Sequence, residues 1–133
     1  IAILWPTEKM KIEDNPLNNN SIVAKLIYEN TSILFTGDIE AEAEKEIVKK
    51  YDKNLKSDIL KVAHHGSKTS STQDFIDKVN PKIALIGVGY KNKFDHPSYT
   101  TIKTLEKRKI KIYRTDLMGE INIKIINNKI ICK

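Results

Sequence analysis

Short apolar runs separated by polar segments predict a chain in which strands alternate with helices. Strands are expected at residues 1–5, 22–28, 32–35, 59–63, 83–88, 110–113, 120–126 and 129–132. Apolar residues at helical spacing predict helices at 40–51, around Phe75, Ile76 and Val79, and at 98–108. The polar stretch 7–20 is expected to be a loop, and residues 29–31 and 127–128 are expected to turn two hairpins.

This order of elements favours an α/β fold with a mixed sheet, which some schemes class as α+β. Antiparallel pairs flank a middle region in which strands and helices alternate. Gly87-Val88-Gly89 lacks the third glycine and the helix start of a dinucleotide-binding fingerprint. No repeat, linker or domain boundary is visible, so residues 1–133 are expected to form a single domain.

Composition narrows the chemistry that the chain could carry. Its 133 residues are 40% hydrophobic and 30% charged, which is typical of a soluble globular protein, and no apolar run is long enough to span a membrane. The single cysteine, Cys132, excludes an internal disulfide and a cysteine-rich zinc site. Any metal would therefore be held by carboxylates and by the three histidines, His64, His65 and His96.

The net charge of +6 is concentrated near the C-terminus. Residues 103–133 contain nine Lys or Arg and three Asp or Glu, whereas residues 1–102 are balanced. A basic segment of this kind suits a polyanionic partner such as nucleic acid. An ordinary solvated, lysine-rich surface would give the same composition.

Asp38 follows an apolar strand and Gly37, where a side chain can project from the edge of a sheet. A carboxylate held there could bind a metal ion, although Asp is also a favoured helix cap. His64 and His65 follow the strand at 59–63, and neighbours on a strand point to opposite faces, so one of them is expected to serve a given metal.

The segment after Gly66 offers the hydroxyls of Ser67 and Ser70 and the ammonium of Lys68, which could hold a phosphate near a helix start. An ordinary polar loop beside one buried histidine is the alternative. His96 precedes another helix and is, by itself, as consistent with a surface histidine. All these residues lie just past strand ends or at helix starts, which is where α/β folds build their sites.

Several motifs, in this order, resemble the metallo-β-lactamase-like C-terminal domain of ComEC-type competence proteins, which take up DNA in bacteria. They are Asn-Asn-Ser-Ile-Val at 19–23, Leu-Phe-Thr-Gly-Asp-Ile-Glu at 34–40, Leu-Lys-Val-Ala-His-His-Gly-Ser-Lys-Thr-Ser-Ser at 60–71, Asp-His-Pro at 95–97 and Tyr-Arg-Thr-Asp at 113–116. The similarity runs from about residue 1 to residue 126.

The resemblance implies an αββα sandwich with two divalent metal ions, zinc or manganese, and phosphodiesterase activity on DNA. Asp38 would bridge the metals, and His65 rather than His64 would be the histidine ligand. His96 would lie at the scissile phosphate as a catalytic residue, and Ser67, Lys68 and Ser70 would contact the substrate. The two metals would stabilise the negative charge that develops in the transition state.

One departure from the family pattern limits this expectation. The main metal-binding motif, His-x-His-x-Asp-His, is absent from the chain. The chain is therefore expected to be the C-terminal portion of the domain and to be inactive by itself. It has too few ligands for a tight dinuclear site, and it could bind no metal at all. Half a sandwich would expose one sheet face to the missing N-terminal half or to a second copy. The parent protein would be membrane-associated through a channel portion, and this segment soluble.

Two alternatives stay open at this point. The chain could be a non-catalytic nucleic-acid-binding or assembly module that uses its basic C-terminal third. It could also belong to a hydrolase of another phosphoester, such as choline phosphate groups, because relatives with a similar His-His-Gly loop act on those.

Overall fold

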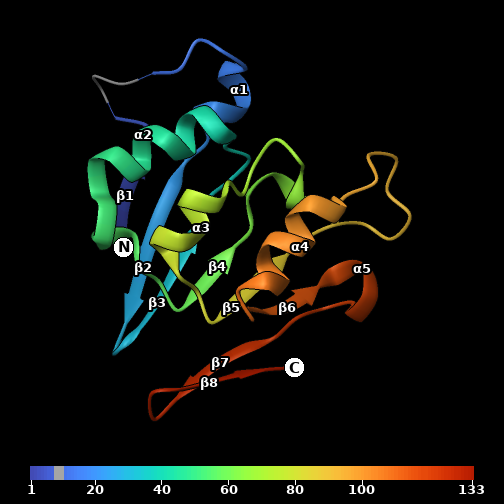
Figure 1. The fold of residues 1–133 in the computed structure, drawn as a ribbon. Helices are drawn as coiled ribbons and strands as arrows, with labels where there is room; N and C mark the ends of the chain where they lie inside the picture. The colour runs from blue at the N-terminus through green and yellow to red at the C-terminus, as the bar shows by residue number, and fades with distance from the viewer. Residues whose placement is uncertain (8–10) are drawn as a thin grey trace.

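The short apolar runs of the sequence form one mixed sheet of six strands in the computed structural model, which describes residues 1–7 and 11–133 (Figure 1). The strand order follows the chain, and the strands are β1 (Ala2–Trp5), β2 (Val23–Tyr28), β3 (Thr31–Phe35), β4 (Ile59–Lys61), β5 (Ile83–Ile86) and β6 (Lys111–Arg114). β1, β2 and β3 are antiparallel neighbours, whereas β3 to β6 run parallel. The predicted α/β class with a mixed sheet is confirmed.

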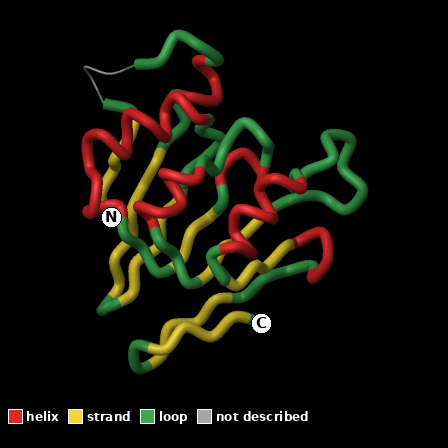
Figure 2. Tube along the Cα trace, viewed as in Figure 1, coloured by secondary structure: helices red, strands yellow, loops and turns green. Residues whose placement is uncertain are grey.

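Three helices cover one face of this sheet: α2 (Ala41–Tyr51), α3 (Gln73–Val79) and α4 (Tyr99–Lys107) (Figures 1 and 2). The hydroxyls of Thr72 and Ser98 cap α3 and α4 by accepting hydrogen bonds from the backbone N–H three residues later. The helices bury Ile47, Phe75 and Leu105 against the sheet, where the fully buried Trp5, Leu34, Leu60, Ala84 and Ile86 complete the main core.

The other face of the sheet is covered only in part. The hairpin of β7 (Ile123–Ile126) and β8 (Lys129–Cys132) packs Ile123 and Ile130 against a second, smaller core of Ile59, Ile83 and Tyr113. On β1 and β3, Ile3 and Phe35 stay exposed, as does Ile1 beside them. The expected exposed face is therefore covered over β4 to β6 and beside Ile33 of β3, and it remains exposed at Ile3 of β1 and Phe35 of β3.

Some local predictions were wrong. Residues 7–20 were expected to be a loop, but α1 (Pro16–Asn19) forms one turn there, and its Asn19 carbonyl accepts a hydrogen bond from the buried Trp5 indole. A second short helix, α5 (Thr115–Met118), follows β6 and was not predicted. Four-residue helices carry too little periodicity to be visible in a sequence. In the part of the chain that the structure describes, no helix has the length and hydropathy of a membrane span.

Candidate metal and phosphodiester site

The candidate residues gather at one edge of the sheet because β3, β4 and β5 are parallel and end side by side. Three loops leave this edge: residues 36–40, residues 62–72 and residues 87–98. Backbone hydrogen bonds join them, from His64 N–H to the Gly37 carbonyl (3.1 Å) and from Ser98 N–H to the Gly66 carbonyl (2.8 Å). These bonds tie the three loops to one another.

His64 and His65 do not continue β4, which ends at Lys61. They lie in a tight 3₁₀ turn (η2, Ala63–Gly66), and both have left-handed backbone conformations, with φ of 46° and 54°. Such conformations cost non-glycine residues free energy and persist only where surrounding contacts enforce them. The expectation that strand geometry would send the two rings to opposite faces is therefore wrong, because the turn directs each ring instead.

Asp38 and His65 form the pair best suited to a metal ion. His65 Nε2 lies 3.7 Å from Asp38 Oδ1, and both side chains are partly exposed. His65 Nδ1 lies 2.6 Å from the Gly87 carbonyl, which can only accept, so Nδ1 carries a proton, and in the neutral ring Nε2, on the side of Asp38, keeps its lone pair. A backbone carbonyl on the distal nitrogen is the usual second partner of a metal-binding histidine.

His64 points to a different carboxylate. Its Nδ1 is 3.2 Å from Glu40 Oε1, an ion-pair distance, but outside hydrogen-bond geometry, and this buried nitrogen has no hydrogen-bond partner among the described residues. Burial alone would raise the pKa of Glu40, but hydrogen bonds from Asn15, Thr69 and Asn18 and the charge of His64 outweigh it, so the pKa lies below its usual value. Glu40 is a site residue that the sequence analysis missed.

His96 lies beside His64, with ring centroids 5.7 Å apart, and its other side stacks on Phe94 at 5.8 Å. The Asn92 side chain holds the His96 backbone through two hydrogen bonds, of 3.0 and 2.7 Å. Burial, followed by the charges of His64 and His65, lowers the pKa of His96, against a smaller opposing effect of Asp95. Three histidines predicted separately from the sequence thus line one region, and the neutral form of His96 is the one its surroundings favour.

The hydroxyls expected to contact substrate are mostly used within the protein. Ser70 is buried and donates to the Ile39 carbonyl (2.7 Å), and Ser67 is buried beside Thr69, whereas Lys68 is exposed. The N–H groups of Ser71 and Thr72, before α3, donate to the two carboxylate oxygens of Glu44. The backbone N–H groups at the start of α3 are therefore already engaged by a buried carboxylate, and the phosphate contacts expected of Ser67, Lys68 and Ser70 stay a prediction.

Glu44 itself is fully buried, and this burial raises its pKa in spite of the N–H bonds that it accepts. Lys61 is a second charged residue that the sequence analysis did not single out. Its ammonium donates to the Val62 carbonyl, and burial lowers its pKa while the charge of Asp38 opposes that shift. From the sequence, Glu44 was an ordinary helix residue and Lys61 an ordinary strand residue. Only the packing of the folded chain brings them close to the candidate site.

Two hollows flank the stacked pair of Phe94 and His96. One, of about 370 Å³, is lined by both rings and by Ser67, Lys68, Asp95, Ser98 and Tyr99. The other, of about 220 Å³, is lined by both rings and by His65, Val88, Gly89 and Asn92. Only the second hollow is lined by His65, so a substrate group could approach the Asp38–His65 pair along that side of Phe94.

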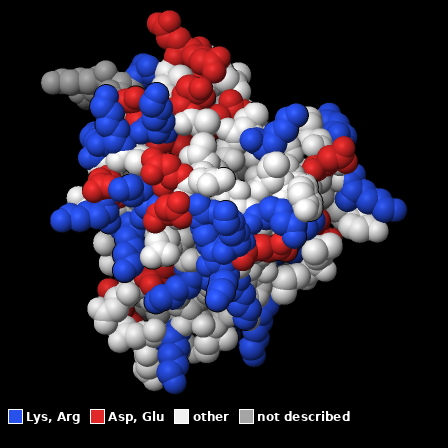
Figure 3. Space-filling model, in the orientation of Figure 1, with Lys and Arg blue, Asp and Glu red and all other residues white. Residues whose placement is uncertain are grey.

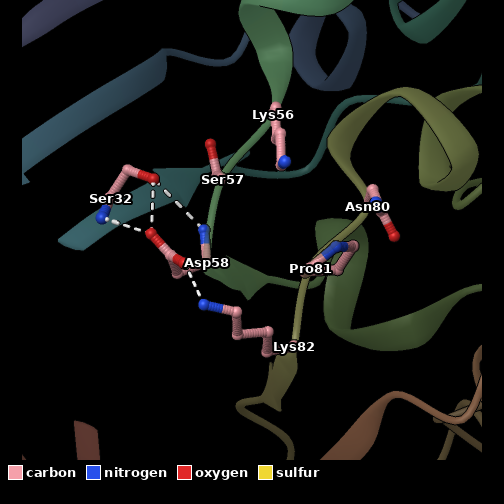
Figure 4. A pocket seen from close by; sticks show the side chains of 7 residues that line it. All are labelled: Ser32, Lys56, Ser57, Asp58, Asn80, Pro81 and Lys82. Carbon is pink, nitrogen blue, oxygen red and sulfur yellow. Dashed lines mark hydrogen bonds and ion pairs between the residues drawn. The ribbon is translucent and has the colours of Figure 1, made fainter. Parts of the chain in front are cut away.

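A further hollow, of about 380 Å³, lies at the opposite end of the sheet (Figure 4). Asp58 dominates it, accepting from the Ser32 backbone and hydroxyl and from Lys82. These bonds join the starts of β3, β4 and β5. No histidine lines this hollow, and its polar groups serve the sheet, so its size does not make it the functional site.

The metal-binding capacity of the described residues is limited. Within residues 1–7 and 11–133, no group of three or more His, Cys, Asp or Glu side chains is arranged to hold a metal ion. Asp38 and His65 have the donor atoms, the spacing and the oriented tautomer of two metal ligands, but a zinc site uses three or four. The residues fit half of a metal centre.

Comparison with known proteins gives a consistent result. Residues 16–90 match the model of the family described as the Metallo-beta-lactamase superfamily. The chain is 38% identical over 110 residues to ComE operon protein 3 of Bacillus subtilis (strain 168), which covers 83% of the chain and 14% of that protein. It is 36% identical over 118 residues to Competence protein ComA of Neisseria gonorrhoeae, covering 89% of the chain and 17% of that protein.

A third relative is the Escherichia coli (strain K12) protein named Uncharacterized protein YcaI, which is 43% identical over 94 residues, covering 71% of the chain and 12% of that protein. The chain thus spans between 12% and 17% of the length of these three relatives.

Proposed function

Because the chain belongs to the metallo-β-lactamase superfamily, as a domain of the ComEC type, we propose that it supplies Asp38 and His65 to a metal-dependent phosphodiesterase site that acts on DNA. The single observation that carries this proposal is the orientation of His65, whose Nδ1 is held by the Gly87 carbonyl while Nε2 faces Asp38. The competence-protein relatives support a DNA-uptake setting, in a membrane-associated bacterial parent.

Two divalent metal ions, when bound, would supply Lewis-acid stabilisation of charge on the phosphate. Asp38 and His65 would hold them, with the other ligands coming from a segment that carries the His-x-His-x-Asp-His motif. Lys68 is the exposed cation nearest in sequence to the histidine turn and would pair with a phosphate oxygen. His96, whose pKa is lowered by burial and by the charges of His64 and His65, would accept or relay a proton at its ring nitrogen.

The exposed apolar strip of Ile1, Ile3 and Phe35 supports the proposal that another half of the domain covers β1 to β3. A second copy of the chain is the alternative cover. The two covers predict different oligomeric states. A longer protein that contains both halves would be monomeric, whereas the chain alone would dimerise through this strip.

The experiment uses the longest native protein that contains this chain, loaded with Zn²⁺ or Mn²⁺, and follows cleavage of a labelled oligonucleotide and a small phosphodiester. Asp38→Asn and His65→Gln should each lower cleavage by more than the roughly 10- to 100-fold that loss of an outer partner of a metal ligand costs. Metal content, measured by mass spectrometry, should fall with activity. Asp74→Asn, at an exposed carboxylate on α3, is the matched control and should change neither. Unchanged metal content and cleavage in Asp38→Asn would refute the proposal.

A non-catalytic nucleic-acid-binding module was the second candidate, based on the basic C-terminal third. Three of its nine cations are engaged with carboxylates: Lys103 with Glu106, Arg108 with Asp77 and Arg114 with Asp116. This pairing reduces the field that the segment presents to a polyanion. The site at the sheet edge is therefore the better-supported location for function.

A further inference from the structure

The loop of residues 87–98 projects from the end of β5 (Figure 1), and it and the first residue of α4 carry large, exposed aromatic side chains. Tyr90, Phe94 and Tyr99 have exposed fractions of 74%, 66% and 74%. Three of the chain's nine Phe, Tyr and Trp residues thus lie within ten positions, all exposed. An exposed group of this kind, beside a polar site, typically marks a binding surface.

Each of these rings has a lysine ammonium close to it. Lys91 lies 5.3 Å from the Tyr90 ring centroid, Lys93 lies 5.1 Å from that of Phe94, and Lys103 lies 5.4 Å from that of Tyr99. Figure 3 shows basic side chains at the outer edge of the molecule, where the loop projects. Alternating aromatic and cationic groups match the two chemical features of a nucleic-acid strand, its flat bases and its phosphates.

The aromatic residues also border the hollows beside the metal-ligand pair. Phe94 lines both of them, while Tyr99 and Lys68 line the larger one. His65 lines the smaller hollow together with Phe94, so a strand that stacks on Phe94 would pass beside the histidine of the Asp38–His65 pair. The larger hollow, at about 370 Å³, is within the usual size range of a ligand pocket.

We propose that Phe94 and Tyr99 stack against bases of a single-stranded nucleic acid, while Lys68 and Lys93 pair with its phosphates and lead the strand to the Asp38–His65 pair. This inference rests on the proposed function, because the phosphate that is led to the Asp38–His65 pair is the one to be cleaved. It adds which side chains bind the substrate and that the bound strand is single. A base offers a free face for stacking only when it is unpaired, so the surface selects single strands over duplex.

Binding of a fluorescently labelled oligo(dT) strand to the 133-residue chain tests this proposal by anisotropy, at low salt and with a chelator present. Phe94→Leu and Tyr99→Leu should each weaken binding by about 5- to 150-fold, the range that loss of one stacked base implies. Tyr28→Leu is the matched control, because Tyr28 is also an exposed aromatic but lies at the end of β2, and it should bind as the wild type does. A blunt duplex should bind more weakly than the single strand.

Lys68→Gln should lower the slope of log K against log salt by about 0.7, the value expected for one phosphate contact on a single strand. Circular dichroism and thermal melting of each variant show whether a loss of binding reflects unfolding. Equal affinities of the wild type, Phe94→Leu and Tyr99→Leu, or equal affinities for single strand and duplex, would overturn the inference, as would a failure of the wild type to bind either.

The same assay separates this inference from the proposed function. Oligo(dT) binding is measured with a chelator present and does not depend on cleavage, whereas Asp38→Asn should abolish cleavage in the longer protein. Strand binding without any cleavage would refute the enzyme and leave the binding surface standing. If the longer protein cleaved DNA but Phe94→Leu and Tyr99→Leu bound oligo(dT) normally, the binding surface would be refuted and the proposed enzyme would stand.

Discussion

Replacing Gly66 by alanine should destabilise the fold and disturb the site at the same time. Gly66 follows the two left-handed histidines and itself has a φ of +82°, a conformation that residues with a Cβ rarely adopt. A Cβ added there would lie 2.6 Å from Pro97 Cβ and 3.2 Å from Pro97 Cα. Because Pro97 follows His96 directly, and Ser98 N–H is bonded to the Gly66 carbonyl, the clash would push the His96 segment away from the His64–His65 turn.

The expected magnitude is the sum of two effects. A left-handed backbone costs an alanine about 1–2 kcal/mol relative to glycine. Forcing an extra carbon into a packed contact costs about 1–3 kcal/mol. The free energy of unfolding should therefore fall by about 2–5 kcal/mol, which is a large part of the stability of a domain of this size.

Urea unfolding followed by circular dichroism measures this change, and the chain contains matched controls. Gly89→Ala should be nearly neutral, because a Cβ at Gly89 meets nothing within 4 Å and Gly89 does not have a positive φ. Gly119 has a φ of +73° but open space around it, so Gly119→Ala reports backbone strain without a clash. If Gly66→Ala were no less stable than Gly89→Ala, the account of the His-His-Gly turn would be refuted.

Three further predictions concern charge, packing and metal. Glu44→Gln should destabilise the fold by about 1–3 kcal/mol, because an amide has one acceptor for the two N–H groups of Ser71 and Thr72. Since burial raises the pKa of Glu44, the stability that it contributes is complete below its unfolded pKa of about 4.5 and is lost as pH rises through its raised folded pKa. The gap between wild type and Glu44→Gln in urea melts should therefore narrow with rising pH, and a gap independent of pH would contradict this. Arg108→Lys should cost up to about 1 kcal/mol in the same melts, because the two-pronged bond to Asp77 that joins α4 to α3 cannot be kept by an ammonium, and an unchanged midpoint would count against that bond. Zn²⁺ should bind the 133-residue chain weakly in calorimetric titrations, since two ligands are too few for a tight site, and His65→Gln should remove saturable binding; equal affinity in both proteins would exclude His65 as a ligand.

The candidate site divides into what was accessible from the sequence and what was not. Asp38, His65 and His96 could be predicted because they follow strand-like runs, and parallel strands bring such positions to one edge. Glu40 and Glu44 could not, because each lies in the first turns of a helix, where acidic residues are common for local electrostatic reasons. Their roles come from partners in distant segments, since Glu40 meets Asn15 and Thr69, and Glu44 meets the residues before α3.

The sequence by itself determined the order of the main strands and helices, the side of the sheet on which loops carry histidines, and the absence of the main metal-binding motif. These properties depend on local periodicity and residue identity, which can be read along the chain. Only the tertiary structure decided that His64 and His65 form a left-handed turn, that Glu44 accepts hydrogen bonds from the N–H groups before α3, and that Phe94 stacks on His96. Each of these depends on contacts between residues far apart in sequence, which enforce backbone and side-chain geometry that local preferences would not select.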